Sequence, residues 1–419
     1  MNKILTTVFI ALQINFSSAQ TMDWTMKANP ALNSINSVAF RPDGQKVLSG
    51  TNCHPASIRL FDLNTANLDW DYTVGSTYMC IMGVTFSSNN NYIAAIEEFG
   101  NIFIFNNTGP APVIIDTINT GTSYGFSTAI SPANDRVAVG CSNGKLKIYS
   151  LPGGVLANDI TAHSGWVMSV CYSPNGNFIV TTGSDQTVKV WSKAGALLYT
   201  LLGHSGYVTS AKVTPDNNFV VSASRDDKIK IWNISTGVLV RTISGHTGDV
   251  NGVDVSPDGS RIVSASSDST CKIWNFNTGA LITTFGVADS GRINAVAWSP
   301  NSDKIVTGNG KSDVTLWTVP SGVGLNESTY GSFGLQVYPN PLDKAATLAV
   351  GNWDFGVQVL EMNIYDLFGN VVYTSVVTGS MSEISRGSLT VGVYVLELRK
   401  PDSNTELKNI TERIKLVVR

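Results

Sequence analysis

The stretch HSGYVTSAKVTPDNNFVVSASRDDKIKIW, residues 204–232, contains most of what determines the fold. It reads as short runs of β-branched and apolar residues separated by turns rich in Pro, Asp and Asn, and Ser-Thr-Gly at residues 235–237 adds another turn. Four successive strands are therefore predicted: Val208–Val213, Phe219–Ala223, Lys228–Trp232 and Val238–Ile243.

The same pattern recurs along the chain. His163–Trp191 and His246–Trp274 are nearly interchangeable with His204–Trp232, and weaker copies extend the series on both sides. The residue that occupies the Pro position of successive copies marks seven units spaced by 41 to 46 residues: Pro42, Ser88, Pro132, Pro174, Pro215, Pro257 and Pro300. A four-stranded sheet repeated every 40 or so residues is typical of propeller blades, so an all-β, seven-bladed β-propeller is predicted.

These units resemble the WD-repeat family over about residues 30–318. The resemblance implies a structural tetrad in each blade, in which an Asp accepts a hydrogen bond from a buried His and a hydroxyl and a Trp complete the network. Three units contain all four residue types: His163, Thr181, Asp185 and Trp191; His204, Ser222, Asp226 and Trp232; His246, Ser264, Asp268 and Trp274.

The other four units depart from the tetrad. Phe61, Phe105 and Tyr149 replace Trp in the first three units, and Asp289 stands at the His position of the seventh. We therefore expect these blades to be less stable. The resemblance also implies that the start of the mature chain supplies the outer strand of the last blade, and Met22–Lys27 is the candidate strand.

Residues 1–19 are predicted to be a signal peptide, because Lys3 precedes an apolar run that ends at the small residues Ser17-Ser18-Ala19. The propeller would then span residues 20–322. The five cysteines are too few and odd in number for a disulfide framework, and if one bridge forms, Cys53 with Cys80 is the predicted pair.

A Gly/Ser-rich linker is predicted at residues 323–334, followed by a small Ig-like β-sandwich at residues 335–419. The sandwich resembles the C-terminal sorting domain of type IX secretion substrates, on the evidence of Tyr338-Pro339-Asn340-Pro341, Asp366-Leu367-Phe368-Gly369, Gly392-Val393-Tyr394 and the final Lys415-Leu416-Val417-Val418. That resemblance implies passage through the periplasm, recognition by the type IX machinery, and a secreted or outer-membrane cell-surface product.

Composition and motif spacing narrow the functional classes. Lys+Arg number 28 and Asp+Glu 31, so no basic field predicts nucleic-acid binding, and no apolar stretch after the first twenty residues is long enough to span a membrane. No spacing matches a metal site, and no catalytic motif lies in the context that its chemistry needs. The sequence therefore predicts no cofactor, no metal and no enzyme activity.

What remains is a surface. The resemblance to WD repeats implies a rim formed by residues three and five positions after the His position. The rim candidates are Tyr124, Phe126, Trp166, Met168, Tyr207, Asp249, Asn251, Arg292 and Asn294. Exposed Trp, Tyr, Met and Arg are enriched in recognition sites, so we expect a non-catalytic scaffold that binds protein partners. Two alternatives stay open: a glycan-binding, lectin-like module, and an exported hydrolase or lyase with its site at the central channel.

Overall fold

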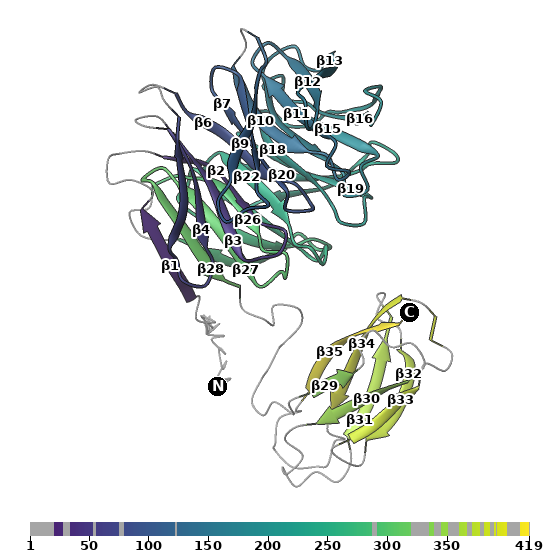
Figure 1. Cartoon of the computed structure of the whole chain (residues 1–419). Coiled ribbons are helices and arrows are strands. Elements are labelled where there is room, and N and C mark those ends of the chain that lie inside the picture. Colours follow the sequence, from purple (N-terminus) through teal and green to yellow (C-terminus); the bar gives the residue numbers. More distant parts are fainter. Residues whose placement is uncertain are drawn as a thin grey trace, which may run out of the picture. The chain divides into compact units, whose positions relative to one another are not determined.

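The structure is a computed structural model, and its chain divides into two compact units after Pro320 (Figure 1). It describes residues 21–27, 34–52, 56–74, 79–121, 124–286, 291–319, 335–338, 345–350, 360–366, 371–377, 381–385, 389–390, 392–399 and 411–418. Within these ranges every regular element is a β-strand, so none of them forms a helix that could cross a membrane.

The first unit consists of seven four-stranded antiparallel sheets, which confirms the predicted seven-bladed propeller. In the first six blades the strands pair in chain order. These blades are β2 Ile35–Phe40, β3 Lys46–Thr51, β4 Ser57–Asp62 and β5 Leu68–Thr73; β6 Ile81–Phe86, β7 Tyr92–Glu97, β8 Asn101–Asn106 and β9 Val113–Asn119; β10 Gly125–Ile130, β11 Arg136–Cys141, β12 Lys145–Ser150 and β13 Leu156–Thr161; β14 Val167–Tyr172, β15 Phe178–Gly183, β16 Val188–Ser192 and β17 Leu197–Leu201; β18 Val208–Val213, β19 Phe219–Ser224, β20 Lys228–Asn233 and β21 Leu239–Ser244; β22 Val250–Val255, β23 Arg261–Ser266, β24 Cys271–Asn275 and β25 Leu281–Phe285.

The seventh blade joins the two ends of the propeller. It contains β26 Ile293–Trp298, β27 Lys304–Asn309 and β28 Asp313–Thr318, and its fourth strand is β1, Thr21–Lys27. β1 runs antiparallel to β28, with Thr21 opposite Thr318 and Lys27 opposite Asp313, and Figure 1 shows the two strands side by side. A strand from the start of the chain thus pairs with a strand that follows it by almost 300 residues.

Apolar residues between the blades form the core of the propeller. Seven buried clusters each combine residues of two neighbouring sheets, and one of them packs Ile35 and Val38 of the first blade against Val306 and Val314 of the seventh. The ring is therefore closed by side-chain packing as well as by β1. At this junction a Cβ on Gly308 would lie 2.4 Å from Ile35 Cγ2, so the two blades approach closely because position 308 has no side chain.

The second unit is a two-sheet β-sandwich, as predicted. One sheet has the order β29-β30-β33 and the other β32-β31-β34-β35, with the inner-facing side chains of Leu348, Ile384, Ile364 and Leu396 fully buried. Its strands are β29 Leu335–Tyr338, β30 Ala345–Val350, β31 Leu360–Tyr365, β32 Val371–Val377, β33 Met381–Ser385, β34 Gly392–Arg399 and β35 Thr411–Val418.

Some predictions fall on residues outside the described ranges. They concern the signal peptide at residues 1–19, Asp289 and the linker at residues 323–334. Cys80 is disulfide-bonded, whereas Cys53, its predicted partner, also lies outside the described residues. Cys141, Cys171 and Cys271 are free thiols.

Candidate functional site

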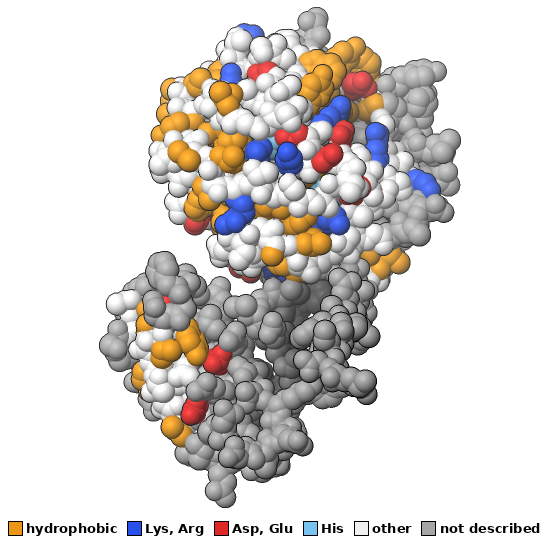
Figure 2. All heavy atoms as spheres, turned by 180° about the vertical axis from the view of Figure 1, so that it is seen from behind, with side chains coloured by type: hydrophobic (Ala, Val, Ile, Leu, Met, Phe, Trp, Pro, Cys, Tyr) orange, Lys and Arg blue, Asp and Glu red, His pale blue; other side chains and the backbone are white. Residues whose placement is uncertain are grey.

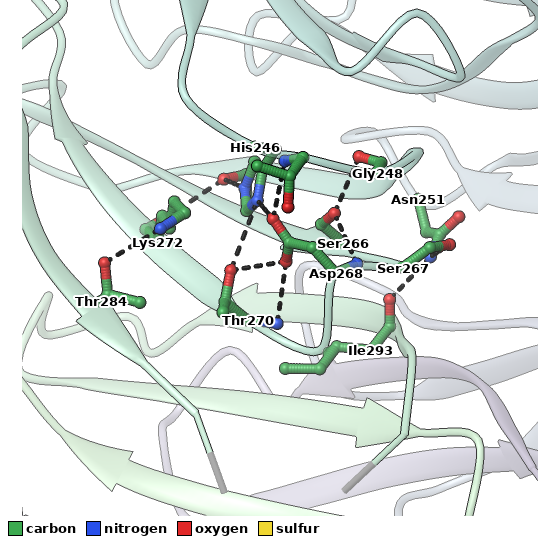
Figure 3. Close-up of polar contacts among 12 residues, drawn as sticks. His246, Gly248, Asn251, Ser266, Ser267, Asp268, Thr270, Lys272, Thr284 and Ile293 are labelled. Carbon is green, nitrogen blue, oxygen red and sulfur yellow. Dashed lines mark hydrogen bonds and ion pairs between the residues drawn. The ribbon is translucent and has the colours of Figure 1, made fainter. Parts of the chain in front are cut away.

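The three tetrads form buried hydrogen-bonded chains. In the fourth blade His163 Nδ1 lies 2.9 Å from Asp185 Oδ1 and Nε2 lies 2.8 Å from Thr181 Oγ1, while the Trp191 indole donates to the same hydroxyl at 2.9 Å. The fifth and sixth blades repeat this arrangement with distances of 2.7 to 2.8 Å; their members are His204, Ser222, Asp226 and Trp232, and His246, Ser264, Asp268 and Trp274. Figure 3 shows the sixth-blade cluster, with Asp268 between His246 and Thr270.

Within each tetrad the hydrogen bonds all run in the same direction, from Trp to Asp. The indole N–H donates to the hydroxyl, the hydroxyl donates to Nε2, and Nδ1–H donates to the carboxylate, which requires a neutral imidazole. Burial lowers the pKa of His163, His204 and His246, and this outweighs the opposing effect of the carboxylates. The tetrads are therefore uncharged at the ring and fully committed to one another, which leaves the imidazoles no free position for a metal ion.

Hydrogen bonds hold the three carboxyl groups ionised. Burial raises their pKa, but hydrogen bonds from the imidazole and from backbone N–H groups, joined at Asp185 and Asp268 by one from a neighbouring hydroxyl, outweigh burial and lower it. At Asp268, where Thr270 Oγ1 donates at 2.6 Å, the pKa falls to about 2.

Three of the four blades without a complete tetrad have other polar pairs at the same end of the sheet. Thr51 accepts from the Ser57 backbone N–H in the first blade, and Asn309 donates to Asp313 in the seventh at 2.9 Å. In the second blade the buried Glu97 accepts from the Asn101 side chain, and among the described residues its Oε2 has no hydrogen-bond partner. Burial accordingly raises the pKa of Glu97.

The rim candidates separate into two groups that the sequence did not distinguish. Tyr124, Trp166, Tyr207, Asp249 and Arg292 directly precede the first strands of their blades, at their ends. The remaining candidates are the second residues of those strands and line the channel: Phe126, Met168, Asn251 and Asn294. In all seven blades this second residue is the extra residue of a β-bulge, which turns it toward the channel mouth.

Polar bulge residues connect neighbouring blades. Thr209 donates to Val250 O at 2.6 Å, Asn251 to Ile293 O at 2.8 Å, Asn294 to Ile35 O at 2.9 Å, and Asn36 to Ile81 O at 3.1 Å. The bond from Asn251 to Ile293 is visible in Figure 3. The amide donors of Asn251 and Asn294 are thus used within the ring. The other bulge residues, Met82, Phe126 and Met168, are apolar, so one side of the mouth is apolar.

Aromatic rings lie at the rim of the second to fifth blades, and we call this set the aromatic arc: Phe99, Tyr124, Phe126, Trp166 and Tyr207. Phe99 contacts Tyr124 with ring centroids 5.7 Å apart, Phe126 stacks on Trp166 at 5.3 Å, and Trp166 meets Tyr207 edge-on at 6.5 Å. The side chains of Tyr124, Trp166 and Tyr207 remain 48%, 46% and 38% exposed. Two groups of rings in contact, Phe99 with Tyr124 and Phe126 with Trp166 and Tyr207, provide a preformed apolar area.

A charged pair extends the aromatic arc. The Arg225 guanidinium lies over the Tyr207 ring, 5.2 Å from its centroid, and 3.8 Å from Asp249 Oδ2. Arg292 is exposed in the seventh blade and does not take part in these contacts. On the face shown in Figure 2, acidic and basic side chains of the described residues are intermixed on the propeller.

The inner strands β2, β6, β10, β14, β18, β22 and β26 surround a central channel with a volume of about 440 Å³. Lys212 and Asp254 are the charged residues among those that line it, and Lys212 Nζ lies 3.8 Å from Asp254 Oδ1. Asp254 also accepts the Trp298 backbone N–H at 2.9 Å, so its carboxylate joins the sixth blade to the seventh.

Three features of this surface were missed from the sequence: Phe99, Arg225 and the Lys212–Asp254 pair. Phe99 and Arg225 lie in turns between the second and third strands of their blades, and Arg225 directly precedes the tetrad Asp. The repeat register itself could have located Lys212 and Asp254, because both occupy the position three residues after the bulge.

Family models match both units. The model described as WD domain, G-beta repeat matches residues 24–62, 154–192, 195–233, 237–275 and 279–318. Each matched segment begins near the outer strand of one blade and ends after the third strand of the next, so the first segment includes most of β1. The model described as Secretion system C-terminal sorting domain matches residues 336–412.

Similar proteins share the repeats over short alignments. WD repeat-containing protein 3 of Homo sapiens is 32% identical over 121 residues, which cover 28% of this chain and 12% of the relative. Nuclear distribution protein PAC1 of Arthroderma otae is 34% identical over 184 residues, 40% of this chain and 38% of the relative. The chain thus spans well under half of each of these relatives. From the matched repeats, the seven-bladed fold and the matched tail, it belongs to the WD-repeat propellers and carries the C-terminal sorting domain that marks proteins for type IX secretion to the cell surface or beyond.

Proposed function

We propose that this protein is an exported, non-catalytic scaffold that binds a protein partner through the aromatic arc. The observation that carries the proposal is the unbroken series of contacts from Phe126 through Trp166 and Tyr207 to Arg225 and Asp249. Aromatic and Arg side chains dominate binding energy at protein interfaces, because they offer large contact area, and the aromatic residues also lose few rotamers on binding. The arc is fixed by its own stacking and needs little reordering to bind.

The arrangement of the polar residues supports a binding role over the enzyme alternative. The tetrad imidazoles are committed to hydroxyl and carboxylate partners, and the polar bulge residues are committed to neighbouring blades. Asp254, the carboxylate in the channel, accepts backbone N–H groups with both oxygens. A hydrolase or lyase would need a convergent acid and base with room for a substrate, and these residues are engaged in holding the ring.

The proposal can be tested with the full-length chain on its host cells. A photo-crosslinking amino acid is placed at position 166 and, as a matched control, at position 197, because Leu197 is 48% exposed and lies on the outer strand β17. We expect a discrete protein adduct from position 166 that position 197 does not give. Unlabelled chain added as a competitor should suppress this adduct. The Trp166→Ala chain should need about 30-fold higher concentration than the unchanged chain to do so, which is the loss of affinity typical of a central interface aromatic.

Two outcomes would contradict the proposal. Identical adducts from positions 166 and 197 would place binding away from the aromatic arc. An adduct at position 166 that is removed by glycosidases and not by proteases would favour the glycan-binding alternative, in which the exposed rings stack on sugars.

A further inference from the structure

We propose that the central channel is a second binding site, which takes a carboxylate attached to an apolar group and holds the carboxylate at Lys212. The site shares Phe126 with the aromatic arc, but the proposal does not rest on protein binding there. It is defined by the channel space, by the ammonium group of Lys212, and by the apolar side of the channel mouth.

The channel has room for a ligand because its inner strands carry small side chains. In each inner strand, the residues one and three positions after the bulge residue face the channel, and they form two successive levels of its wall. Apart from Lys212 and Asp254, the residues at these levels are Gly, Ala, Ser, Thr or Cys. Lys212 is thus the one long side chain in this part of a channel of about 440 Å³, and 46% of it is exposed there.

The Lys212 ammonium group retains unused hydrogen-bond donors. Its described neighbours provide an ion-pair partner, Asp254 at 3.8 Å, but no acceptor within hydrogen-bond distance. The Asp254 carboxylate outweighs burial and raises the pKa of Lys212, so the amine is protonated at neutral pH. Asp254 itself receives the backbone N–H groups of Val255 at 3.0 Å and Trp298 at 2.9 Å, so both of its oxygens already have hydrogen-bond donors other than Lys212.

Hydroxyl groups that line the same channel would supply further donors to a carboxylate. Ser169 and Ser210 line the channel on the fourth and fifth blades, and among the described residues their hydroxyls have no hydrogen-bond partner. A ligand carboxylate could accept from the ammonium group and from these hydroxyls, which are charge-assisted bonds of the stronger kind.

The channel mouth selects the rest of the ligand. Lys212 lies three residues along β18 from the bulge residue Thr209, which corresponds to about 10 Å of strand. At the mouth, Met82, Phe126 and Met168 present apolar groups, whereas the opposite side is occupied by Asn and Thr donors that bond to the next blade. An acid with an apolar body about 10 Å long fits both ends, either as a small carboxylic acid or as the C-terminus of an apolar peptide.

The test measures the binding of two pairs of probes to the full-length chain by ligand-observed NMR titration. The small-acid pair is 4-phenylbutanoate and its amide, and the peptide pair is a Gly-Gly-Phe peptide as free acid and as amide. We expect at least one acid to bind about tenfold or more tightly than its amide. Lys212→Met should remove this preference, while Lys193→Met, which deletes an exposed positive charge outside the channel, should keep it.

Cys171 provides a second readout that needs no variant. It lines the channel beside Lys212 and is only partly buried, whereas Cys141 and Cys271 are fully buried. A bound acid should slow alkylation of Cys171 by iodoacetamide, measured by peptide mass spectrometry, and the amide should not. Equal binding of acid and amide, an acid preference that survives in a folded Lys212→Met chain, or unchanged Cys171 alkylation under saturating acid would each overturn the proposal.

Discussion

The three buried imidazoles make the interior of the propeller sensitive to acid. Their pKa lies below the usual value near 6.5, so the folded state resists protonation and the unfolded state does not. Stability from this source is complete above about pH 6.5 and is lost as pH falls through the folded-state pKa. The carboxylates of Asp185, Asp226 and Asp268 add a further loss below about pH 4, because their pKa is also lowered.

We therefore predict that the melting midpoint of the propeller transition falls between pH 7.5 and pH 5, measured by calorimetry of the full chain. Replacing one tetrad His, as in His204→Asn, should lower the midpoint at pH 7.5 and reduce its dependence on pH. A midpoint that stays constant from pH 7.5 to pH 5 would show that the imidazoles are not held neutral.

Glu97 has the opposite pH dependence. Burial raises its pKa, so it stabilises the fold when protonated and that contribution is lost as pH rises through the folded-state pKa. Glu97→Gln mimics the protonated form, and we predict that it raises the free energy of unfolding at pH 8, with the gain disappearing at pH 4. Glu98→Gln is the matched control, because it removes a neighbouring charge that is only partly buried. A loss of stability at pH 8 in Glu97→Gln alone would contradict this assignment.

At the scale of elements, the inner-strand bulges both shape the mouth and join the blades. Asn294→Ala removes the donor to Ile35 O across the junction of the seventh and first blades, and we predict a loss of about 0.5–1.5 kcal/mol. Met168→Leu, at the equivalent bulge of the fourth blade, should change stability by less than about 0.5 kcal/mol. Urea unfolding of the two variants distinguishes them, and equal losses would mean that the bulge amides do not connect blades.

The outer strand β1 supplies the backbone closure of the ring. A chain that begins after Lys27 leaves β28 as an unpaired edge strand, and such edges promote association. We predict a lower melting midpoint and concentration-dependent self-association relative to a chain that begins at Thr21, observed by sedimentation velocity. Asp23→Asn, which loses only the side-chain contacts to Lys304 and Thr318, should remain monodisperse. A monodisperse chain without β1 would contradict a closing role for this strand.

Sequence reasoning predicted elements better than it predicted the surface. The alternation of short strands and turns repeats seven times, so blade number and the four-stranded sheets follow from periodicity alone. The bulges do not: they insert a residue without a distinctive residue type, and Asn, Met, Phe and Thr all occupy the same bulge position. For that reason Asn251 and Asn294 were grouped with the exposed rim, although their amides bond to the next blade.

The contacts of the aromatic arc could not be predicted either. Tyr124, Trp166 and Tyr207 were expected at the rim from the repeat position, but Phe99 and Arg225 come from turns whose positions depend on how neighbouring blades meet. We expected the blades without a tetrad to be less stable. Their stability also depends on replacement pairs such as Asn309 with Asp313, which no repeat pattern identifies. Long-range packing, rather than local propensity, determines these contacts.

At the scale of the molecule, the propeller has an interior that holds the ring together and an exposed aromatic surface, through which we propose that it binds. The most direct measurement compares the melting midpoints of Trp166→Ala and Asp226→Ala in the full chain. Trp166 is half exposed, whereas Asp226 is a buried partner of His204 whose loss should cost about 1–3 kcal/mol. We predict an unchanged midpoint for Trp166→Ala and a fall of several degrees for Asp226→Ala. A Trp166→Ala chain that melts as early as Asp226→Ala would contradict this prediction, because Trp166 would then belong to the structural core.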